Sequence, residues 1–411
     1  MKKPVFDSLK IITLGIFFMP FFVANANHGP INTDTSYDIN ILVLKYFPLK
    51  SDGTIIDTNA DTGGWDLARM KQSADDQIAA SRRALERATR YRGHTFPENP
   101  PALRFTIVDA IERIAPLPYI TPPPAGPGPF YLDYTRVLND NAICDYVRNK
   151  NVVEVWLFKS WAKPGYAHSE SKMSGPNGDI SNSYRTNEMP LCGKTYRVYT
   201  HDLQREDLFL EVWGHQLESE ISTFDPDLAN LFFNPCYNKT NCYPLGDPKN
   251  PVTGRCGNVH NPPNARSEYD RENPTPNNSD CLDWNPNGLG TLSPISCANW
   301  GCNWKSISDN PVLNYIVWNW QNVPGRKNEI TYEGKKLRNW WDAHGDFDRM
   351  MSENEKLTLA QSPPSPVPRP APPQVESVEQ QRSIPLNQTL IVGGVVLILF
   401  VLAVILFFVA R

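Results

Sequence analysis

The chain has 411 residues, 40% of them hydrophobic, which is enough to bury one large core or two smaller ones. Its formal net charge of -4 at pH 7 gives no electrostatic case for nucleic-acid binding, which needs a concentrated basic surface, so we expect no nucleic-acid partner. The sequence contains no P-loop, GxGxxG, GxSxG or HExxH motif. The commonest signatures of nucleotide-binding proteins, serine hydrolases and metalloproteases are therefore missing.

The first residues have the pattern of a secretory signal peptide. Three lysines precede an apolar run over residues 11–23, and small residues follow at positions 24–26. We expect residues 1–26 to be a signal peptide that is cleaved. The following domain would then lie outside the cytoplasm.

The next 200 residues alternate between strand and helix patterns. We predict strands over residues 38–47, 103–109, 152–158 and 195–200, and helices over residues 67–92, 134–149 and 201–224. Alternation at this spacing favours βαβ units. The sequence therefore predicts an α/β domain over residues 36–233, with a mostly parallel, Rossmann-like sheet and flanking helices.

The helix predicted over residues 201–224 has two distinct faces. Leu203, Trp213, Leu217 and Ile221 form an apolar stripe, with Phe209 at its edge. Spacings of three and four residues place Asp207, Glu211, His215 and Glu218 together on the opposite face. Imidazole and carboxylate groups together suit zinc, iron or manganese. The alternative is a polar helix face in water.

A glycine in this helix favours a covered face. Gly214 costs about 1 kcal/mol relative to Ala in a helix interior, so we expect another segment to pack closely against it. Residues 234–352 could supply that segment. They form a predicted subdomain that is rich in cysteine, tryptophan and loops, and its His260 would reach the helix. We therefore predict His215, Glu218 and His260 as metal ligands, and Glu211, His215 and Glu218 as catalytic residues. A structural role for His260 is the alternative.

Disulfides are expected to hold this loop-rich segment together. The chain has eight cysteines, and six of them lie between residues 236 and 302. An even number outside the cytoplasm indicates disulfide pairing, although spacing alone does not decide which cysteines pair. The absence of CxxC argues against a structural zinc site at these cysteines.

A second candidate site lies at the carboxyl ends of the predicted strands, where open α/β sheets bind ligands. There we predict Lys159, Glu170 and His201 as substrate-binding residues, and Asp202 as a helix cap.

Tryptophan supports a third interpretation. Seven of the 11 tryptophans follow Cys281, and helices are predicted over residues 311–320 and 336–351. Their rings could line a glycan-binding surface, with core packing as the alternative.

The carboxyl-terminal segment predicts a membrane anchor. Residues 361–389 are rich in proline and form a predicted stalk, and residues 390–410 are an unbroken apolar run of transmembrane length. We therefore expect a single-pass protein of the cell membrane, with its globular part outside the cytoplasm.

Five short motifs resemble those of a group of uncharacterised secreted proteins. They are EVW at 154–156, ESKMSGP at 170–176, GHQLES at 214–219, CGNVHNPPNA at 256–265 and CLDW at 281–284. The resemblance covers residues 39–341 and implies that the α/β and Cys-rich regions form one unit. It implies no activity.

From the residues we predict a membrane-anchored extracytoplasmic protein, either a metal-dependent hydrolase of surface or external polymers or a non-enzymatic binder of glycan or protein. The cofactor of the hydrolase would be a divalent metal such as zinc.

Overall fold

A computed structural model describes residues 34–49, 65–120, 131–159, 170–203 except 182 and 184, 206–233, 256–302 except 268, and 311–359. These residues belong to one compact unit that spans Met1–Gln361. The predicted signal peptide, stalk and transmembrane segment lie outside the described residues. Among the described helices, none has the length and apolar character needed to cross a membrane.

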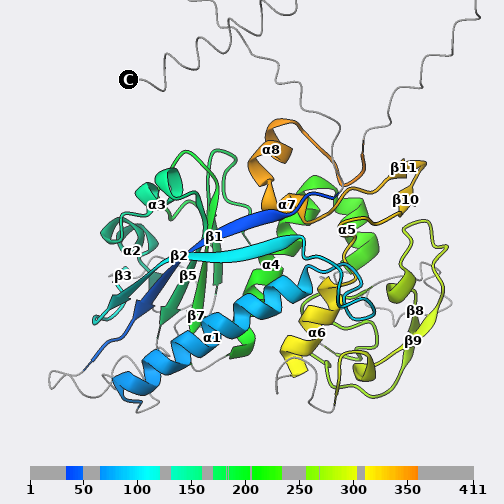
Figure 1. The fold of residues 1–411 in the computed structure, drawn as a ribbon, viewed down its shortest axis with the longest axis horizontal. Coiled ribbons are helices and arrows are strands. Elements are labelled where there is room, and N and C mark those ends of the chain that lie inside the picture. Colours follow the sequence, from blue (N-terminus) through cyan, green and yellow to red (C-terminus); the bar gives the residue numbers. More distant parts are fainter. Residues whose placement is uncertain are drawn as a thin grey trace, which may run out of the picture. The chain divides into compact units, whose positions relative to one another are not determined.

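A five-stranded, mostly parallel sheet forms the centre of the α/β region (Figure 1). Its order is β2, β1, β5, β7, β6, and only β6 runs antiparallel to its neighbour. The strands are β1 (Tyr37–Tyr46), β2 (Leu103–Arg113), β5 (Val152–Lys159), β6 (Glu170–Ser174) and β7 (Tyr196–Asp202). The prediction of a mixed α/β fold with a mostly parallel sheet is confirmed. Strand β6 is not among the strands that the sequence predicts.

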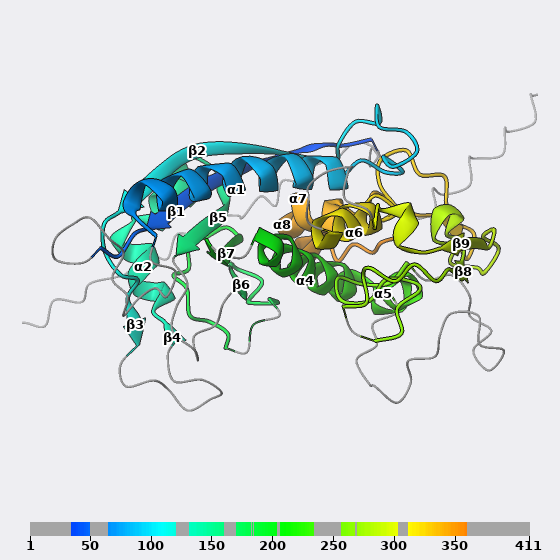
Figure 2. The same ribbon diagram turned by 90° about the horizontal axis from the view of Figure 1, so that it is seen from below.

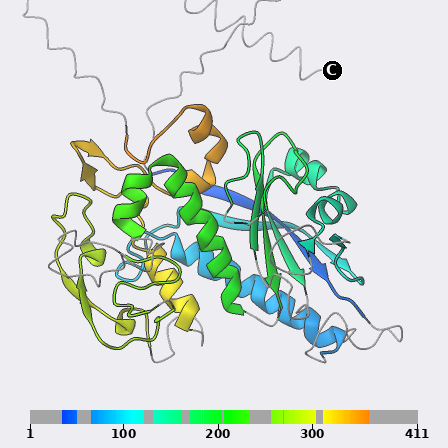
Figure 3. The same cartoon turned by 180° about the vertical axis from the view of Figure 1, so that it is seen from behind.

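Both faces of the sheet are covered, as its nearly continuous apolar strands require. One face packs against α2 (Tyr134–Asp140) and α3 (Ile143–Asn149), which form a smaller core with side chains such as Leu42 and Val155. The other face packs against α1 (Leu67–Ala88) and α4 (Glu206–Phe224). Helices α5 (Pro226–Phe233) and α6 (Pro311–Trp320) pack on α4 and belong to the same core. Figures 2 and 3 show α4 between the sheet and the loop-rich segment.

In the described part of the loop-rich segment, the elements besides α6 are short. They include the hairpins β8 (Asn277–Ser279) with β9 (Ser293–Ile295) and β10 (Thr331–Tyr332) with β11 (Lys335–Lys336), and the helices α7 (Asp342–Gly345) and α8 (Phe347–Ser352). Another short hairpin, β3 (Tyr119–Ile120) with β4 (Tyr131–Leu132), belongs to the α/β region. Disulfides join Cys144 to Cys192, Cys256 to Cys281 and Cys297 to Cys302. These three bonds confirm the expected disulfide pairing. Cys236 and Cys242 lie outside the described residues.

Four predicted helices have wrong boundaries. The helix predicted over residues 67–92 ends at Ala88. Residues 134–149 form two helices, because Ala142 adopts a left-handed conformation with φ 51°. Residues 336–351 begin with a strand and contain only the short helices α7 and α8. The helix predicted from residue 201 begins at Glu206, because His201 and Asp202 continue strand β7. Pairing with β5 extends this strand beyond its predicted end.

The tryptophans of the terminal region lie in the core. Trp318 is 3% exposed, and Trp320, Trp340 and Trp341 are fully buried. They form part of the same core as the sheet-facing residues of α4. Their rings therefore do not form an aromatic surface for a glycan.

A buried ionic network joins α4 to the sheet and to α7. The His344 ring contacts Glu220 Oε2 through Nδ1 at 2.7 Å and Glu154 Oε1 through Nε2 at 2.8 Å. Arg197 pairs with Glu220, and the Trp213 indole donates to Glu154 Oε1 at 2.9 Å. Burial and Arg197 each lower the pKa of His344, but the two carboxylates outweigh them and raise it above 6.5. The network therefore favours a charged imidazolium inside the protein.

Candidate metal centre

The candidate centre forms where one loop of the Cys-rich segment packs against α4. A Cβ added at Gly214 would lie 2.3 Å from Val259 Cγ1 and 2.4 Å from Trp320 Cζ2, closer than atoms can pack. Only glycine allows the loop and α6 to approach the helix this closely. The structure confirms the predicted close contact at Gly214, and the contact explains why the polar face of α4 is not open to bulk water.

Hydrogen bonds fix the loop over residues 256–261. Asn258 Oδ1 accepts from the backbone N–H groups of His260 and Asn261, both at 2.9 Å. From α6, Tyr315 donates to the Asn258 carbonyl oxygen at 2.8 Å and Asn319 donates to the Cys256 carbonyl oxygen at 2.7 Å. The disulfide at Cys256 ties the start of the loop to Cys281. The loop thus holds His260 in a defined position above α4.

Two imidazoles face each other across this contact. His215 Nε2 lies 2.9 Å from His260 Nε2, and the rings are perpendicular, with centroids 4.6 Å apart. Glu211 Oε1 lies 3.4 Å from His260 Nε2. One potential ligand atom from each of Glu211, His215 and His260 can be chosen so that all three lie within 4.8 Å of one another. The structure therefore brings together three of the four predicted centre residues as a potential ligand set.

Glu211 is held as a carboxylate by residues that the sequence analysis did not single out. Arg271 Nη2 lies 3.0 Å from Glu211 Oε2, and the Tyr269 hydroxyl donates to Glu211 Oε1 at 3.3 Å. Burial raises the pKa of Glu211, but the hydrogen bond from His260 and the charge and hydrogen bond of Arg271 outweigh this effect and lower it to about 2. Glu211 is therefore ionised at neutral pH.

Tyr269 and Arg271 lie in an irregular segment without periodicity, so the sequence gives no signal that they would meet α4. Tyr269 has φ 64°, and its hydroxyl also lies 3.0 Å from His260 Nε2. Arg271 is only 3% exposed and its Nε donates to the Val259 carbonyl oxygen at 3.1 Å. Both residues therefore support the centre from the loop side.

Glu218 contacts the opposite edge of His215. Its Oε2 lies 3.5 Å from His215 Nδ1, and its Oε1 accepts from the Val259 backbone N–H at 2.8 Å. An ion bound at His215 Nε2 would therefore lie on the far side of the ring from Glu218. This geometry favours Glu211 as the carboxylate ligand and gives Glu218 the role of orienting His215. The side chain of Asp207 lies outside the described residues.

The predicted sheet-edge residues do not form one site. Side chains alternate along a strand, so Lys159 on β5 and Glu170 on β6 point to the face covered by α2, whereas His201 on β7 points to the face covered by α1. Lys159 forms a buried ion pair with Asp202, and Glu170 accepts from the Tyr134 hydroxyl at 2.7 Å.

His201 contacts Gln77 Oε1 of α1 at 2.5 Å and is fully buried. Asp202 is not a helix cap, because it ends strand β7 and pairs with Lys159. The histidine therefore contributes to the packing of α1 on the sheet. The combination of Lys159, Glu170 and His201 as one substrate site has no geometric support.

Comparison with known proteins adds no assignment: no protein-family model, curated protein or solved structure matches this chain. The function must therefore be argued from the site itself.

Proposed function

We propose that Glu211, His215 and His260 bind one divalent transition metal ion, and that the protein is a metal-dependent hydrolase. The observation that carries this proposal is the convergence of two imidazole nitrogens and a carboxylate oxygen from two separate segments. Two ligands at about 2.0–2.1 Å from a tetrahedral zinc ion lie about 3.3 Å apart. The distances of 2.9 Å and 3.4 Å from His260 Nε2 to its two neighbours bracket this value.

The crowding around His260 Nε2 also favours a cation. The atoms His215 Nε2, Tyr269 Oη and Glu211 Oε1 all lie within 3.4 Å of this single nitrogen. A neutral imidazole nitrogen carries either one proton or one lone pair, so it cannot satisfy all three neighbours at once. A cation between them would accept the lone pairs of both imidazoles and of Glu211 together.

The surroundings of the three ligands suit catalysis as well as binding. Three protein ligands leave one tetrahedral position for water, and a metal ion at such a site lowers the pKa of the bound water to about 7. The side chains of His215 and His260 are 19% and 28% exposed, so water and substrate can reach them. Glu218 orients His215, Arg271 orients Glu211, and Tyr269 places its hydroxyl beside Glu211 and His260.

Extracellular location, stalk and membrane anchor remain part of the proposal. They would present the site to surface or external polymers, which are the substrates we infer. A Rossmann-like arrangement is the corresponding fold proposal, supported by the parallel strands and by helices on both sheet faces.

The test is metal analysis of the purified full-length protein. The metal content is measured as purified, and again after the protein has been treated with chelator and reloaded with zinc or cobalt. We expect one ion per chain in the wild type, and loss of that ion in His215→Ala and His260→Ala. His94→Ala is the matched control, because His94 contacts Asn322 outside the centre. Wild-type protein that stays metal-free after reloading would overturn the proposal.

Hydrolysis is tested separately with p-nitrophenyl esters and p-nitrophenyl phosphodiesters. We expect cleavage of at least one substrate class that follows metal content across the same variants. Full metal occupancy without any cleavage would leave the non-enzymatic binder as the better proposal.

A further inference from the structure

A cavity of about 320 Å³ lies where the end of α1 meets the segment after Cys281. Its lining includes Tyr91, Arg92, Asp283, Trp284 and Leu289. None of these residues belongs to the candidate metal centre. The cavity therefore requires its own explanation.

The α1 side of the cavity is rigidly built. Arg92 has φ 53°, so the chain turns sharply after the helix, and the Arg92 backbone N–H donates to the Gln321 carbonyl oxygen at 2.5 Å. Gln321 in turn donates from Nε2 to the Arg87 carbonyl oxygen at 3.0 Å. This wall is anchored to the end of α6 before any ligand arrives.

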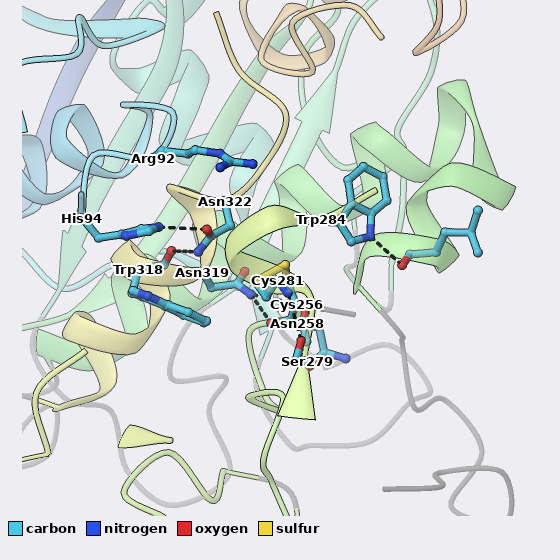
Figure 4. Close-up of a disulfide and its surroundings, with 12 residues drawn as sticks. Arg92, His94, Cys256, Asn258, Ser279, Cys281, Trp284, Trp318, Asn319 and Asn322 are labelled. Carbon is cyan, nitrogen blue, oxygen red and sulfur yellow. Dashed lines mark hydrogen bonds between the residues drawn. A yellow bond between two sulfur atoms is a disulfide. The ribbon is translucent and has the colours of Figure 1, made fainter. Parts of the chain in front are cut away.

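The opposite side is anchored by a disulfide. Figure 4 shows the Cys256–Cys281 bond with Arg92 and Trp284 in its surroundings, and these two residues come from different segments. Asp283 Oδ2 accepts from the Thr291 backbone N–H at 3.2 Å and from its hydroxyl at 3.0 Å, and Trp284 Nε1 donates to the Leu231 carbonyl oxygen at 3.2 Å. Walls held in this way reduce the entropy lost when a ligand binds.

Each charged side chain of the lining has an ion-pair partner. Arg92 Nη2 lies 3.6 Å from Asp283 Oδ1, and Glu329 Oε1 lies 2.9 Å from the Nζ of Lys336, which lies outside the lining. A charged ligand would have to break one of these pairs, whereas a neutral ligand can hydrogen-bond to them. The Asp283 side chain is 55% exposed and the Arg92 side chain 30% exposed, so both have free surface for such bonds.

Apolar groups complete the lining. Tyr91, Trp284 and Ile330 contribute to the walls, and Leu289 is 78% exposed at the rim. A sugar ring presents C–H faces beside several hydroxyl groups, and such a ligand fits a cavity that combines aromatic and aliphatic carbon with carboxylate, amide and guanidinium groups. Asn285 supplies the amide.

We propose that this cavity binds one neutral sugar residue of a glycan. Asp283 and Asn285 hydrogen-bond to its hydroxyl groups, Arg92 donates to its oxygens, and Tyr91 and Leu289 contact its C–H surface. The site is independent of the metal centre and adds a binding function to the proposed catalytic one.

The test uses full-length protein in a sugar-free detergent, because glucoside and maltoside detergents would occupy the site. The probes are the methyl glycosides of glucose, mannose, galactose and N-acetylglucosamine, measured by saturation-transfer NMR and titration calorimetry. We expect saturable binding of at least one glycoside. Asp283→Ala and Arg92→Met should each weaken it at least tenfold.

Two controls separate this site from other effects. Asp145→Ala removes an acid from α3 whose side chain is 68% exposed, and His215→Ala removes a proposed metal ligand. Both should bind the glycoside as the wild type does. The proposal is overturned if no glycoside binds, if Asp283→Ala binds normally, or if only acidic sugars or inorganic phosphate bind.

Discussion

Arg271 and Glu211 form an ion pair across 60 residues of sequence, with Arg271 Nη2 3.0 Å from Glu211 Oε2. The pair occupies one carboxylate oxygen and leaves the other beside His260 and Tyr269. Arg271 is almost fully buried, so it links the loop-rich segment to α4 with a bond that water screens weakly. This contact decides which oxygen of Glu211 faces the proposed metal.

Replacing Arg271 should weaken both folding and metal binding. Arg271→Met leaves the Glu211 carboxylate buried without its partner, and removing one member of a buried ion pair costs about 3–5 kcal/mol. We expect a loss of stability of about this size in urea unfolding, and a lower zinc affinity. Arg266→Met is the control, because the Arg266 side chain is 71% exposed. An Arg271→Met protein with wild-type stability would contradict a structural role for the pair.

Acid should destabilise the protein partly through Glu211. Folding lowers the pKa of Glu211 from 4.5 to about 2. The contribution of this group to stability is therefore fully present above pH 4.5 and is lost as the pH falls from 4.5 towards 2. The difference corresponds to about 3 kcal/mol. Glu211→Gln should remove this part of the pH dependence. The measurement is the urea unfolding free energy of metal-free protein between pH 6 and pH 3, and equal slopes in the two proteins would refute the expectation.

Alkali should destabilise the protein through His344. Its pKa is raised above 6.5 on folding, so its contribution is fully present below pH 6.5 and is lost as the pH rises through the folded pKa. We expect His344→Gln to be less stable than wild type at pH 6. Its unfolding free energy should also fall less than that of the wild type between pH 6 and pH 9. His94→Gln is the control, since burial lowers the pKa of His94 instead. The measurement is the unfolding free energy across this pH range.

Gly214→Ala should lower the stability, although alanine is the better helix former. The added methyl group would overlap Val259 and Trp320, and forced overpacking costs about 1–3 kcal/mol, more than the gain of about 1 kcal/mol in helix propensity. Ser222→Ala, at an exposed position of the same helix, should be neutral or slightly stabilising. Differential scanning calorimetry would compare the two. A rise in Tm for Gly214→Ala would show that the loop does not pack on α4 as described.

Loss of the Cys256–Cys281 disulfide should impair the metal centre. The double variant Cys256→Ala/Cys281→Ala releases the start of the loop that carries His260 and should cost about 3 kcal/mol in the chain-entropy account. We expect lower metal occupancy at limiting zinc. Cys144→Ala/Cys192→Ala is the control, since this disulfide lies with the core on the other sheet face. Equal metal affinity in both double variants would show that the Cys256–Cys281 disulfide is not needed to position His260.

Residue patterns along the chain are sufficient to predict the local features of this protein. Continuous apolar runs predicted β1 and β5, because strands covered on both faces need apolar residues on both sides. The spacing of Glu211, His215 and Glu218 placed them on one helix face, and Gly214 indicated close packing. Even the disulfide bonding followed from the number of cysteines and the expected compartment.

The distant residues that complete the site are set by how separate segments pack in three dimensions. Tyr269 and Arg271 reach Glu211 from a segment without periodicity, so no local pattern marks them. The predicted helix over residues 201–224 includes His201, but pairing with β5 holds this residue in strand β7. The choice of Glu211 over Glu218 depends on which edge of the His215 ring faces His260. That is a matter of side-chain orientation across two segments, and sequence spacing within one helix carries no information about it.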